Sequence, residues 1–165
     1  CWSSLFTPRA IFYRFDKKLH TTKVSVAVVV QQLIESEISG IAFTVHPVTK
    51  DHDQMVIEAG FGLGEAIVGG KVTPDTYVIH KEDWKLLEKH ISEQSMMIVK
   101  AKQGTVEKEI PKPKQGGQKL PDKEILKLAK LCQKIEEHYQ YPQDIEWALH
   151  KGKLYILQSR PITTL

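Results

Sequence analysis

The closing segment of the chain, residues 144–160, constrains the fold more than any other part of the sequence. Two strand-like runs, Asp144–Leu149 and Leu154–Arg160, flank a turn around Gly152. Runs of this length separated by a glycine-containing turn are typical of a β-hairpin. The chain is therefore expected to contain an antiparallel pair of strands and a core that is based on a sheet.

Four polar side chains of this hairpin form two pairs. Asp144 and Glu146 are two residues apart, as are Gln158 and Arg160, so each pair projects from one face of its own strand. Carboxylate and carboxamide oxygens suit Mg²⁺, which keeps some waters and bridges substrate phosphates. The guanidinium of Arg160 is a planar donor for a phosphate oxygen. Pairs on one face could form a metal and phosphate site, whereas pairs on opposite faces would scatter it. The alternative interpretation is an amphipathic surface hairpin whose polar face meets water.

The length of the turn decides whether the two pairs share a face. A two-residue turn, 151–152, would place Gln158 across from Ile145, with the acidic residues on the other side. A three-residue loop, 150–152, would place Gln158 across from Asp144. We predict the three-residue loop.

Other segments also carry strand signals. Val24–Gln32 is β-branched and almost continuously apolar, as expected of a central strand that is covered on both faces. Gly40–Val45 and Met55–Ala59 flank a turn-like segment and predict a second hairpin. Further strands are expected at Asp75–His80 and near Val106–Ile110.

Helices are predicted at the beginning of the chain and before the closing hairpin. Cys1–Phe6 has the character of a helix end, and Thr7 followed by Pro8 is typical of the N-cap and first turn of a second helix that runs towards Phe15. Between Pro121 and Tyr139, apolar residues recur at helical spacing after an acidic first turn. With the strands, these helices predict an α+β fold in which helices flank a mixed or antiparallel sheet.

The glycine-rich segment 60–70 has two interpretations. Its backbone N–H groups could surround a phosphate, although the segment matches neither GxGxxG nor GxxxxGK[ST]. Alternatively, it is a turn from strand to helix in which Glu65 lies near the helix N-terminus. Glu65 is a secondary candidate metal ligand. The later segment 102–119, rich in lysine, glycine and proline, is expected to be a mobile excursion.

Composition argues against several classes of protein. The formal charge of +3 arises from 23 basic and 20 acidic residues spread along the chain, without the basic stripe expected for DNA or RNA binding. No apolar run approaches the roughly 20 residues that span a bilayer, so no membrane partner is expected. The seven histidines lack the spacing of zinc ligands. Cys1 and Cys132 form neither a paired framework nor a CxxC element, which favours a reducing, cytoplasmic location.

Five ordered segments carry a family resemblance. They are CWSSLFTPRAIFYR (1–14), VSVAVVVQQL (24–33), SGIAFTVHPVT (39–49), GLGEAIVGGKVTPD (62–75), and PQDIEWA (142–148) with its continuation LQSRP (157–161). Together they resemble the ATP-binding domain of the phosphoenolpyruvate synthase and pyruvate, phosphate dikinase family, which rifampicin phosphotransferases share. His46 departs from the family pattern, which usually has aspartate at this position.

The resemblance implies an ATP-grasp fold, in which ATP lies between two α+β subdomains. Residues 1–23 would be a helical lead-in from the first subdomain, and residues 24–165 would form the second. Gln31 would lie on the strand that joins the subdomains, where the adenine edge is read, with Gln32 as its neighbour. ATP and Mg²⁺ are the cofactors that the resemblance implies.

The resemblance also implies roles for the closing hairpin. Glu146 and Gln158 would bind the metal and the phosphates, and Arg160 would contact phosphate and stabilise the charge that develops during transfer. Asp144 would support them as a further metal-site residue.

The family's reaction implies partners outside this chain. A phosphoryl group moves from ATP to a histidine on a mobile domain and then to pyruvate in a barrel domain. The glycine-rich phosphate loop of the family precedes the segment that begins at Cys1, so we expect a fragment that is inactive alone and binds MgATP weakly. The alternatives are an enzyme with another acceptor, like rifampicin phosphotransferase or pyruvate, phosphate dikinase, or a degenerate nucleotide-sensing or interaction module.

Overall fold

The computed structural model describes residues 1–19, 21 and 23–163, and the chain divides into two units. The first unit, Cys1–Leu33, contains the 3₁₀ helix η1 (Trp2–Phe6), the helix α1 (Pro8–Asp16) and an extended segment. The Thr7 hydroxyl accepts a hydrogen bond of 3.3 Å from the Ala10 backbone N–H. This contact confirms the predicted N-cap, and the helix that follows it ends close to the predicted position.

The extended segment corrects one prediction. Residues 23–33 form no strand, so the predicted central strand Val24–Gln32 is wrong. Val29 and Val30 are 81% and 97% exposed, whereas a central strand would be covered on both faces. A strand needs hydrogen-bonded neighbours, and the described residues of the first unit, 1–19, 21 and 23–33, include no other strand with which it could pair.

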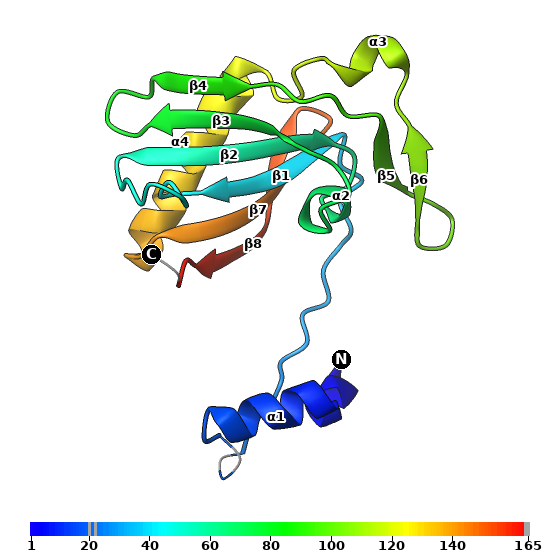
Figure 1. The fold of residues 1–165 in the computed structure, drawn as a ribbon, viewed down its shortest axis with the longest axis vertical. Coiled ribbons are helices and arrows are strands. Elements are labelled where there is room, and N and C mark those ends of the chain that lie inside the picture. The colour runs from blue at the N-terminus through cyan, green and yellow to red at the C-terminus, as the bar shows by residue number, and fades with distance from the viewer. Residues whose placement is uncertain (20, 22, 164–165) are drawn as a thin grey trace. The chain divides into compact units, whose positions relative to one another are not determined.

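The second unit, Ile34–Leu165, is built on a six-stranded antiparallel sheet with the order β4-β3-β2-β1-β7-β8 (Figure 1). Its strands are β1 (Ile38–Phe43), β2 (Gln54–Phe61), β3 (Asp75–His80), β4 (Leu86–His90), β7 (Gln143–His150) and β8 (Lys153–Pro161). The predicted α+β class, both predicted hairpins and the strand at Asp75–His80 are therefore confirmed, while β4 was not predicted.

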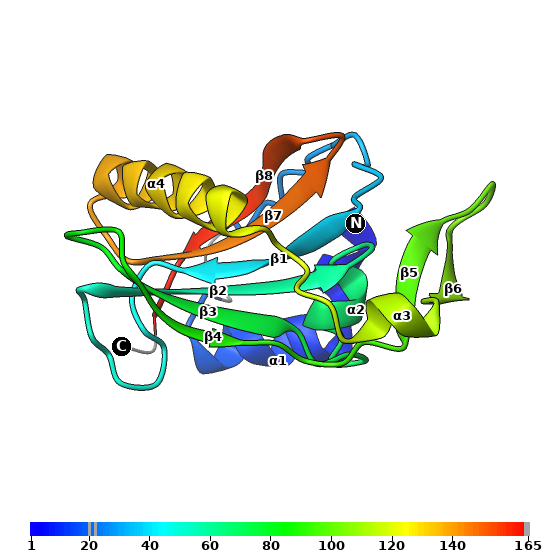
Figure 2. The same cartoon turned by 90° about the horizontal axis from the view of Figure 1, so that it is seen from above.

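The helix α4 (Asp122–Tyr139) covers one face of this sheet, as Figure 2 shows. It confirms the helix that was predicted between Pro121 and Tyr139. Its side chains Ile125, Leu128 and Cys132 are fully buried against residues of the sheet that include Tyr77 and Trp147. Burial raises the pKa of the Cys132 thiol to about 12, so this cysteine is a packing residue. Within the described part of the chain, no helix has the length and apolar character needed to cross a membrane.

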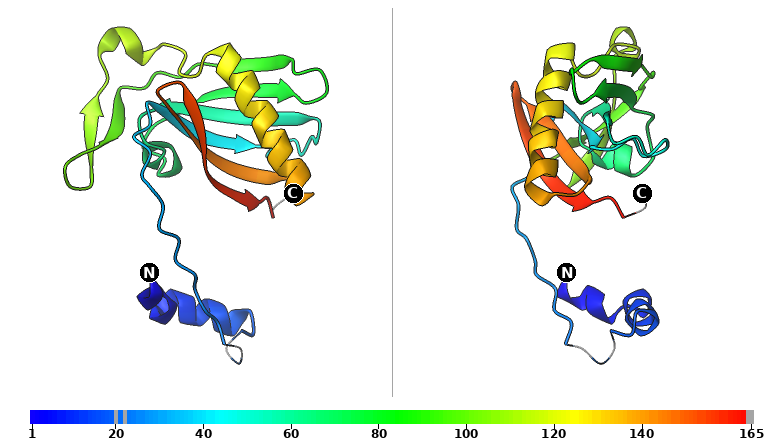
Figure 3. Two further views of the ribbon diagram at one scale, coloured as in Figure 1. Left: turned by 180° about the vertical axis from the view of Figure 1, so that it is seen from behind. Right: turned by 90° about the vertical axis from the view of Figure 1, so that its left-hand side faces the viewer.

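The opposite face of the sheet has the short helix α2 (Glu65–Val68) near one end (Figure 3). A separate two-stranded sheet, β5 (Met96–Lys100) and β6 (Thr105–Glu109), follows β4 in the chain, and α3 (Lys112–Gln115) follows it. The strand expected near Val106–Ile110 is confirmed as β6. Its partner β5 and the helix α3 were not predicted.

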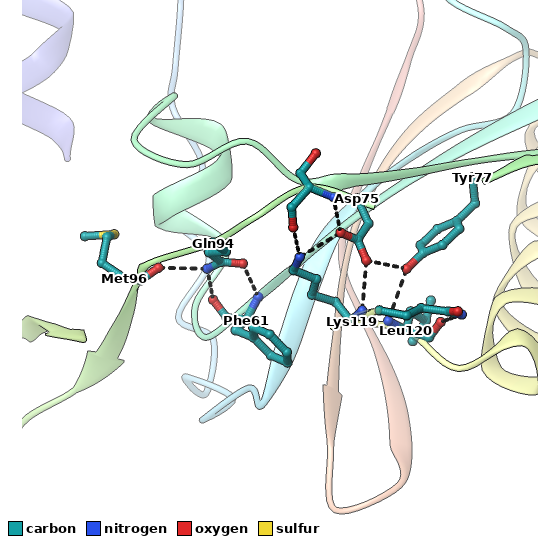
Figure 4. Close-up of polar contacts among 9 residues, drawn as sticks. Phe61, Asp75, Tyr77, Gln94, Met96, Lys119 and Leu120 are labelled. Carbon is teal, nitrogen blue, oxygen red and sulfur yellow. Dashed lines mark hydrogen bonds and ion pairs between the residues drawn. The ribbon is translucent and has the colours of Figure 1, made fainter. Parts of the chain in front are cut away.

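The segment that carries β5 and β6 is fixed at both ends by buried polar contacts (Figure 4). Asp75 and Lys119 form an ion pair with 2.8 Å between Oδ1 and Nζ, and both side chains are fully buried. The Asp75 carboxylate also accepts hydrogen bonds from the backbone N–H of Ser92 at 3.0 Å and of Lys119 at 2.8 Å, and from the Tyr77 hydroxyl at 2.8 Å. Segment 102–119 was expected to be a mobile excursion, but these contacts attach its end to the core.

Gln94 provides the second attachment of this segment. Its Oε1 accepts a hydrogen bond from the Phe61 N–H at 2.9 Å, and its Nε2 donates to the carbonyl groups of Phe61 at 3.0 Å and Met96 at 2.9 Å. The side chain is 1% exposed, so it satisfies backbone groups that would otherwise be buried without partners. The end of β2 and the start of β5 are thus joined by one carboxamide.

Candidate functional site

The closing hairpin presents its polar side chains on the face of the sheet that α4 does not cover. Across β7 and β8, Asp144 is opposite Arg160, and Glu146 is opposite Gln158. Directly opposed residues of antiparallel strands project to the same face. The intervening Ile145 is fully buried in the core on the other face. The two predicted pairs therefore lie together on one face.

The turn that produces this arrangement differs from the prediction. The three-residue loop is wrong, because the pair His150 and Lys153 flanks a two-residue turn. Its central residues Lys151 and Gly152 have φ values of 49° and 72°. A two-residue turn of the type I′ class requires positive φ at both positions, and here a lysine adopts one of them.

A shift of register within the strands returns the polar residues to one face. Trp147 is opposite Ile156, but Glu146 is opposite Gln158, so Leu157 is an extra residue in β8. An extra residue of this kind is a β-bulge, which changes the facing of the strand beyond it. The prediction considered only the loop as the source of register, whereas the bulge supplies it.

Arg160 and Asp144 form the ion pair of this face. The Arg160 Nε and Nη2 atoms lie 2.8 Å and 2.7 Å from the same Asp144 oxygen, Oδ2. This hydrogen-bonded carboxylate raises the pKa of the guanidinium, which stays charged. The Arg160 side chain is 66% exposed, and a guanidinium has five N–H donors, so further donors remain for a ligand.

Glu146 and Gln158 provide oxygen atoms that can accept a ligand. Within residues 1–19, 21 and 23–163, neither side chain forms a hydrogen bond or ion pair. Among the same residues, no group of three or more histidine, cysteine, aspartate or glutamate side chains forms a metal cage. One or two carboxylates with a carboxamide, rather than an all-protein cage, are the ligands with which proteins bind Mg²⁺ beside phosphates.

A third carboxylate, Glu58, was missed by the sequence analysis. Ile41 of β1 is opposite Glu58 on one side and opposite Glu146 on the other, so both acids lie in one row on the same face. Burial, and secondly the negative charge of Asp144, raise the pKa of Glu58. The available signal was a lone acid within the otherwise apolar strand Met55–Gly60.

The glycine-rich segment forms a turn from strand to helix, as the second interpretation proposed. Gly62 has a φ of 87°, and a Cβ there would lie 2.5 Å from the Ile98 carbonyl oxygen. The N–H of Gly62 donates to the Glu37 carbonyl at 3.0 Å, and that of Leu63 donates to the Ile98 carbonyl at 2.8 Å. These donors are therefore not free for a phosphate, and the glycine is needed for close approach to β5.

The other predicted residues lie at separate places. Glu65 is the first residue of α2 and is exposed. Gln31 and Gln32 lie in the extended segment of the first unit, and their contact with adenine stays a prediction. His46 accepts hydrogen bonds at its Nδ1 from the backbone N–H groups of Val48 and Thr49, both at 3.2 Å. It therefore stabilises the turn as an aspartate side chain would.

The sequence of the whole chain matches a known domain family. Residues 1–165 match the family described as pyruvate phosphate dikinase, AMP/ATP-binding domain. The chain is 52% identical over 165 residues to a probable phosphoenolpyruvate synthase of Archaeoglobus fulgidus, covering all of this chain and 22% of that protein. It is 49% identical over 166 residues to a probable phosphoenolpyruvate synthase of Methanocaldococcus jannaschii, covering all of this chain and 14% of that protein.

A relative with another name is also similar over the full chain. The rifampicin phosphotransferase of Bacillus subtilis is 43% identical over 166 residues, covering all of this chain and 19% of that protein. The chain thus spans between 14% and 24% of the length of its phosphoenolpyruvate synthase relatives.

Proposed function

The chain belongs to the pyruvate phosphate dikinase AMP/ATP-binding domain family, and we propose that it is the ATP-binding part of a phosphoenolpyruvate synthase. One observation carries this proposal. Asp144 and Glu146 face Arg160 and Gln158 across the closing hairpin, so acidic, amide and guanidinium groups converge on one surface. Such a surface can bind a divalent cation together with a polyphosphate.

The proposed fold is ATP-grasp, with the six-stranded sheet as the core of its second subdomain. In this proposal residues 1–23 belong to the first subdomain, and the segment after them joins the two. Gln31 would contact the adenine edge there, with Gln32 beside it. The phosphates of ATP would bind on the face of the sheet that α4 leaves open.

The side chains of the hairpin have complementary roles in phosphoryl transfer. Glu146 and Gln158 would hold Mg²⁺, which when bound neutralises phosphate charge and fixes the phosphate oxygens. Arg160 would bind a phosphate oxygen through its planar donors and stabilise the charge of the transition state. Asp144, which binds two guanidinium nitrogens, would support this site beside the metal.

The complete reaction would need parts of the protein outside this chain. We propose that ATP and water phosphorylate a histidine of another domain with release of AMP and phosphate, and that the phosphohistidine then transfers its phosphoryl group to pyruvate in a barrel domain. The overall conversion would be ATP, pyruvate and water to AMP, phosphoenolpyruvate and phosphate. A cytoplasmic location fits such a reaction and the free thiols of Cys1 and Cys132.

The test is ATP-dependent phosphorylation of the complete protein, followed with ATP labelled in its transferable phosphates. Glu146→Ala should abolish incorporation while the protein remains folded, because a metal ligand is lost. Glu88→Ala, an exposed carboxylate of β4 in the same sheet, is the matched control and should retain the wild-type rate. Wild-type incorporation in Glu146→Ala would remove this residue from the site.

The likeness to a rifampicin phosphotransferase supports a second candidate acceptor. Product assays with pyruvate and with rifampicin distinguish the two enzymes, and phosphorylation of neither would favour a nucleotide-sensing module. We also propose that residues 1–165 alone bind MgATP weakly, because a nucleotide enclosed by one wall loses much of its contact area. Low-micromolar affinity in titration calorimetry would contradict this.

A further inference from the structure

The hairpin of β5 and β6 contacts the start of α2 and the turn that follows this helix. The Thr105 hydroxyl donates a hydrogen bond of 3.1 Å to Glu65 Oε2, at the first residue of the helix. The Lys71 ammonium lies 2.7 Å from Glu107 Oε1, just beyond the end of the helix. Thr105 and Glu107 are two residues apart in β6, so both project from one face of the strand. One face of β6 therefore contacts the first residue of α2 and a residue of the turn that follows the helix.

The backbone of β5 fixes the loop that leads into α2. The Ile98 carbonyl accepts the hydrogen bond of Leu63, and Gly62 leaves no space for a side chain beside it. Ile98 itself is buried with Leu63 and Ala66 in a small apolar cluster. The hairpin and the glycine-rich turn are thus packed as one body, in which a change of either backbone would move Glu65.

The base of the hairpin is attached to the large sheet by the buried contacts of Gln94, Asp75 and Lys119. In addition, the Ile110 N–H donates to the Ser95 carbonyl at 2.8 Å across the base. The side chains of Gln94, Asp75 and Lys119 are buried, so water does not compete for their hydrogen bonds. The base of the hairpin is consequently attached to the large sheet independently of α2.

We propose that the β5–β6 hairpin positions the carboxylate of Glu65, with Thr105 as the positioning residue. The inference rests on the proposed function and adds to it Glu65, which the sequence analysis names as a secondary candidate metal ligand. An exposed glutamate on a four-residue helix has several accessible rotamers, and one hydroxyl donor restricts them. Because Thr105 binds only Oε2, Oε1 remains available for the cation.

The test uses the complete protein and measures the Mg²⁺ concentration that gives half-maximal ATP-dependent phosphorylation. Thr105→Val removes the donor and keeps the shape, and it should raise this concentration about fivefold, the value of one hydrogen bond of about 1 kcal/mol. Thr105→Ser restores a hydroxyl and should return the concentration to the wild-type value. Gln103→Ala, in the turn of the same hairpin, is the control and should have no effect.

A second comparison separates positioning from general stability. Glu65→Gln should also raise the Mg²⁺ requirement, and adding Thr105→Val to it should give no further rise, because both changes remove one interaction. Additive effects, or an unchanged requirement in Thr105→Val, would overturn the inference. If the wild-type protein binds ATP and Thr105→Val has an unchanged Mg²⁺ requirement, only this inference is overturned. If the wild-type protein binds no ATP, the proposed function is overturned as well.

Discussion

Two ion pairs, each between an aspartate and a basic residue, have nearly the same distance but differ in the burial of their side chains. The Asp75 to Lys119 distance is 2.8 Å with both side chains fully buried, and the Asp144 to Arg160 distance is 2.7 Å with the arginine side chain 66% exposed. Asp75 also accepts two backbone N–H groups and a tyrosine hydroxyl, whereas the described partner of Asp144 is Arg160.

The difference distinguishes a structural pair from the pair that we propose to be functional. Removing one partner of a buried pair leaves an uncompensated charge in a medium that solvates it poorly, so Asp75 and Lys119 must stay together. In the second pair the arginine is exposed to water, although the Asp144 side chain is only 12% exposed, and this reduces the contribution of the pair to stability. Arg160 therefore retains donors that face solvent and can reach a ligand, as the proposed function requires. Burial, rather than the residue types, distinguishes the two pairs.

The largest expected effect is on the buried pair. Lys119→Met should lower the free energy of unfolding by about 3–5 kcal/mol, because Asp75 is left charged and buried. Lys100→Met is the matched control, since the ion pair of Lys100 with Glu35 has the same kind of geometry, 2.7 Å, but is exposed. That control should change the free energy by less than about 1 kcal/mol. Denaturant unfolding followed by the fluorescence of buried Trp147 measures both, and equal losses would contradict the comparison.

The opposite pattern is expected at the exposed pair. Arg160→Ala should reduce the rate of ATP-dependent phosphorylation about 10²–10³-fold, as loss of a donor to transition-state charge does. Its free energy of unfolding should change less than that of Lys119→Met, because the guanidinium of Arg160 is exposed to water whereas Lys119 is fully buried. Arg160→Lys keeps the charge without the planar fork and should recover only part of the rate. Wild-type turnover in Arg160→Ala would show that the pair has no role in transfer.

The sequence predicts the sheet and its polar face better than the turn that aligns them. Spacing of two residues is enough to place Asp144 with Glu146, because side-chain facing in a strand depends only on local geometry. The bulge at Leu157 depends on packing of the whole hairpin and has no comparable local signature. For this reason the shared face was predicted correctly from a loop length that was wrong.

Strand signals fail where the partners are not local. Val24–Gln32 has a strong strand composition, yet no strand forms there in the described residues, because a strand also needs neighbours. In contrast, β5 begins at Met96 and pairs with β6, although the sequence analysis found only its partner. Glu58 lies in the same row as Glu146 because β2 and β7 both pair with β1, and these residues are distant in the sequence. Composition predicts a preference, and tertiary pairing decides the outcome.

Two glycines allow the same comparison between a tightly packed position and an open one, now for the backbone. Gly62→Ala should lower the free energy of unfolding by about 2–3 kcal/mol, because φ is positive and the new Cβ would lie 2.5 Å from the Ile98 oxygen. Gly70 has a similar φ of 66° but open space around it. Gly70→Ala should therefore cost only about 1 kcal/mol, for the backbone conformation alone. The same unfolding assay measures the difference, and equal losses would show that the approach to β5 carries no strain.

The smallest expected effect is on Glu58, whose side chain is neither fully buried nor fully exposed. Its pKa is raised in the folded protein by burial and by Asp144, so the folded state binds its proton more tightly than the unfolded state does. Stability should therefore fall as the pH rises from the ordinary glutamate pKa through the raised one, and stay constant above it. Glu58→Gln does not titrate, and it should be more stable than the wild type near pH 7.

This gain should be less than about 1 kcal/mol, because water screens a carboxylate that is partly exposed. It should disappear as the pH is lowered below the ordinary glutamate pKa, where the wild-type side chain is also neutral. Glu88→Gln, at an exposed acid of the same sheet, is the control and should give no such gain in stability near pH 7. Thermal unfolding between pH 4 and pH 7 measures the two variants. If Glu58→Gln remains more stable than the wild type at pH 4, the substitution improves packing. The negative charge of Glu58 on the open face of the sheet would then not lower stability in the absence of a cation.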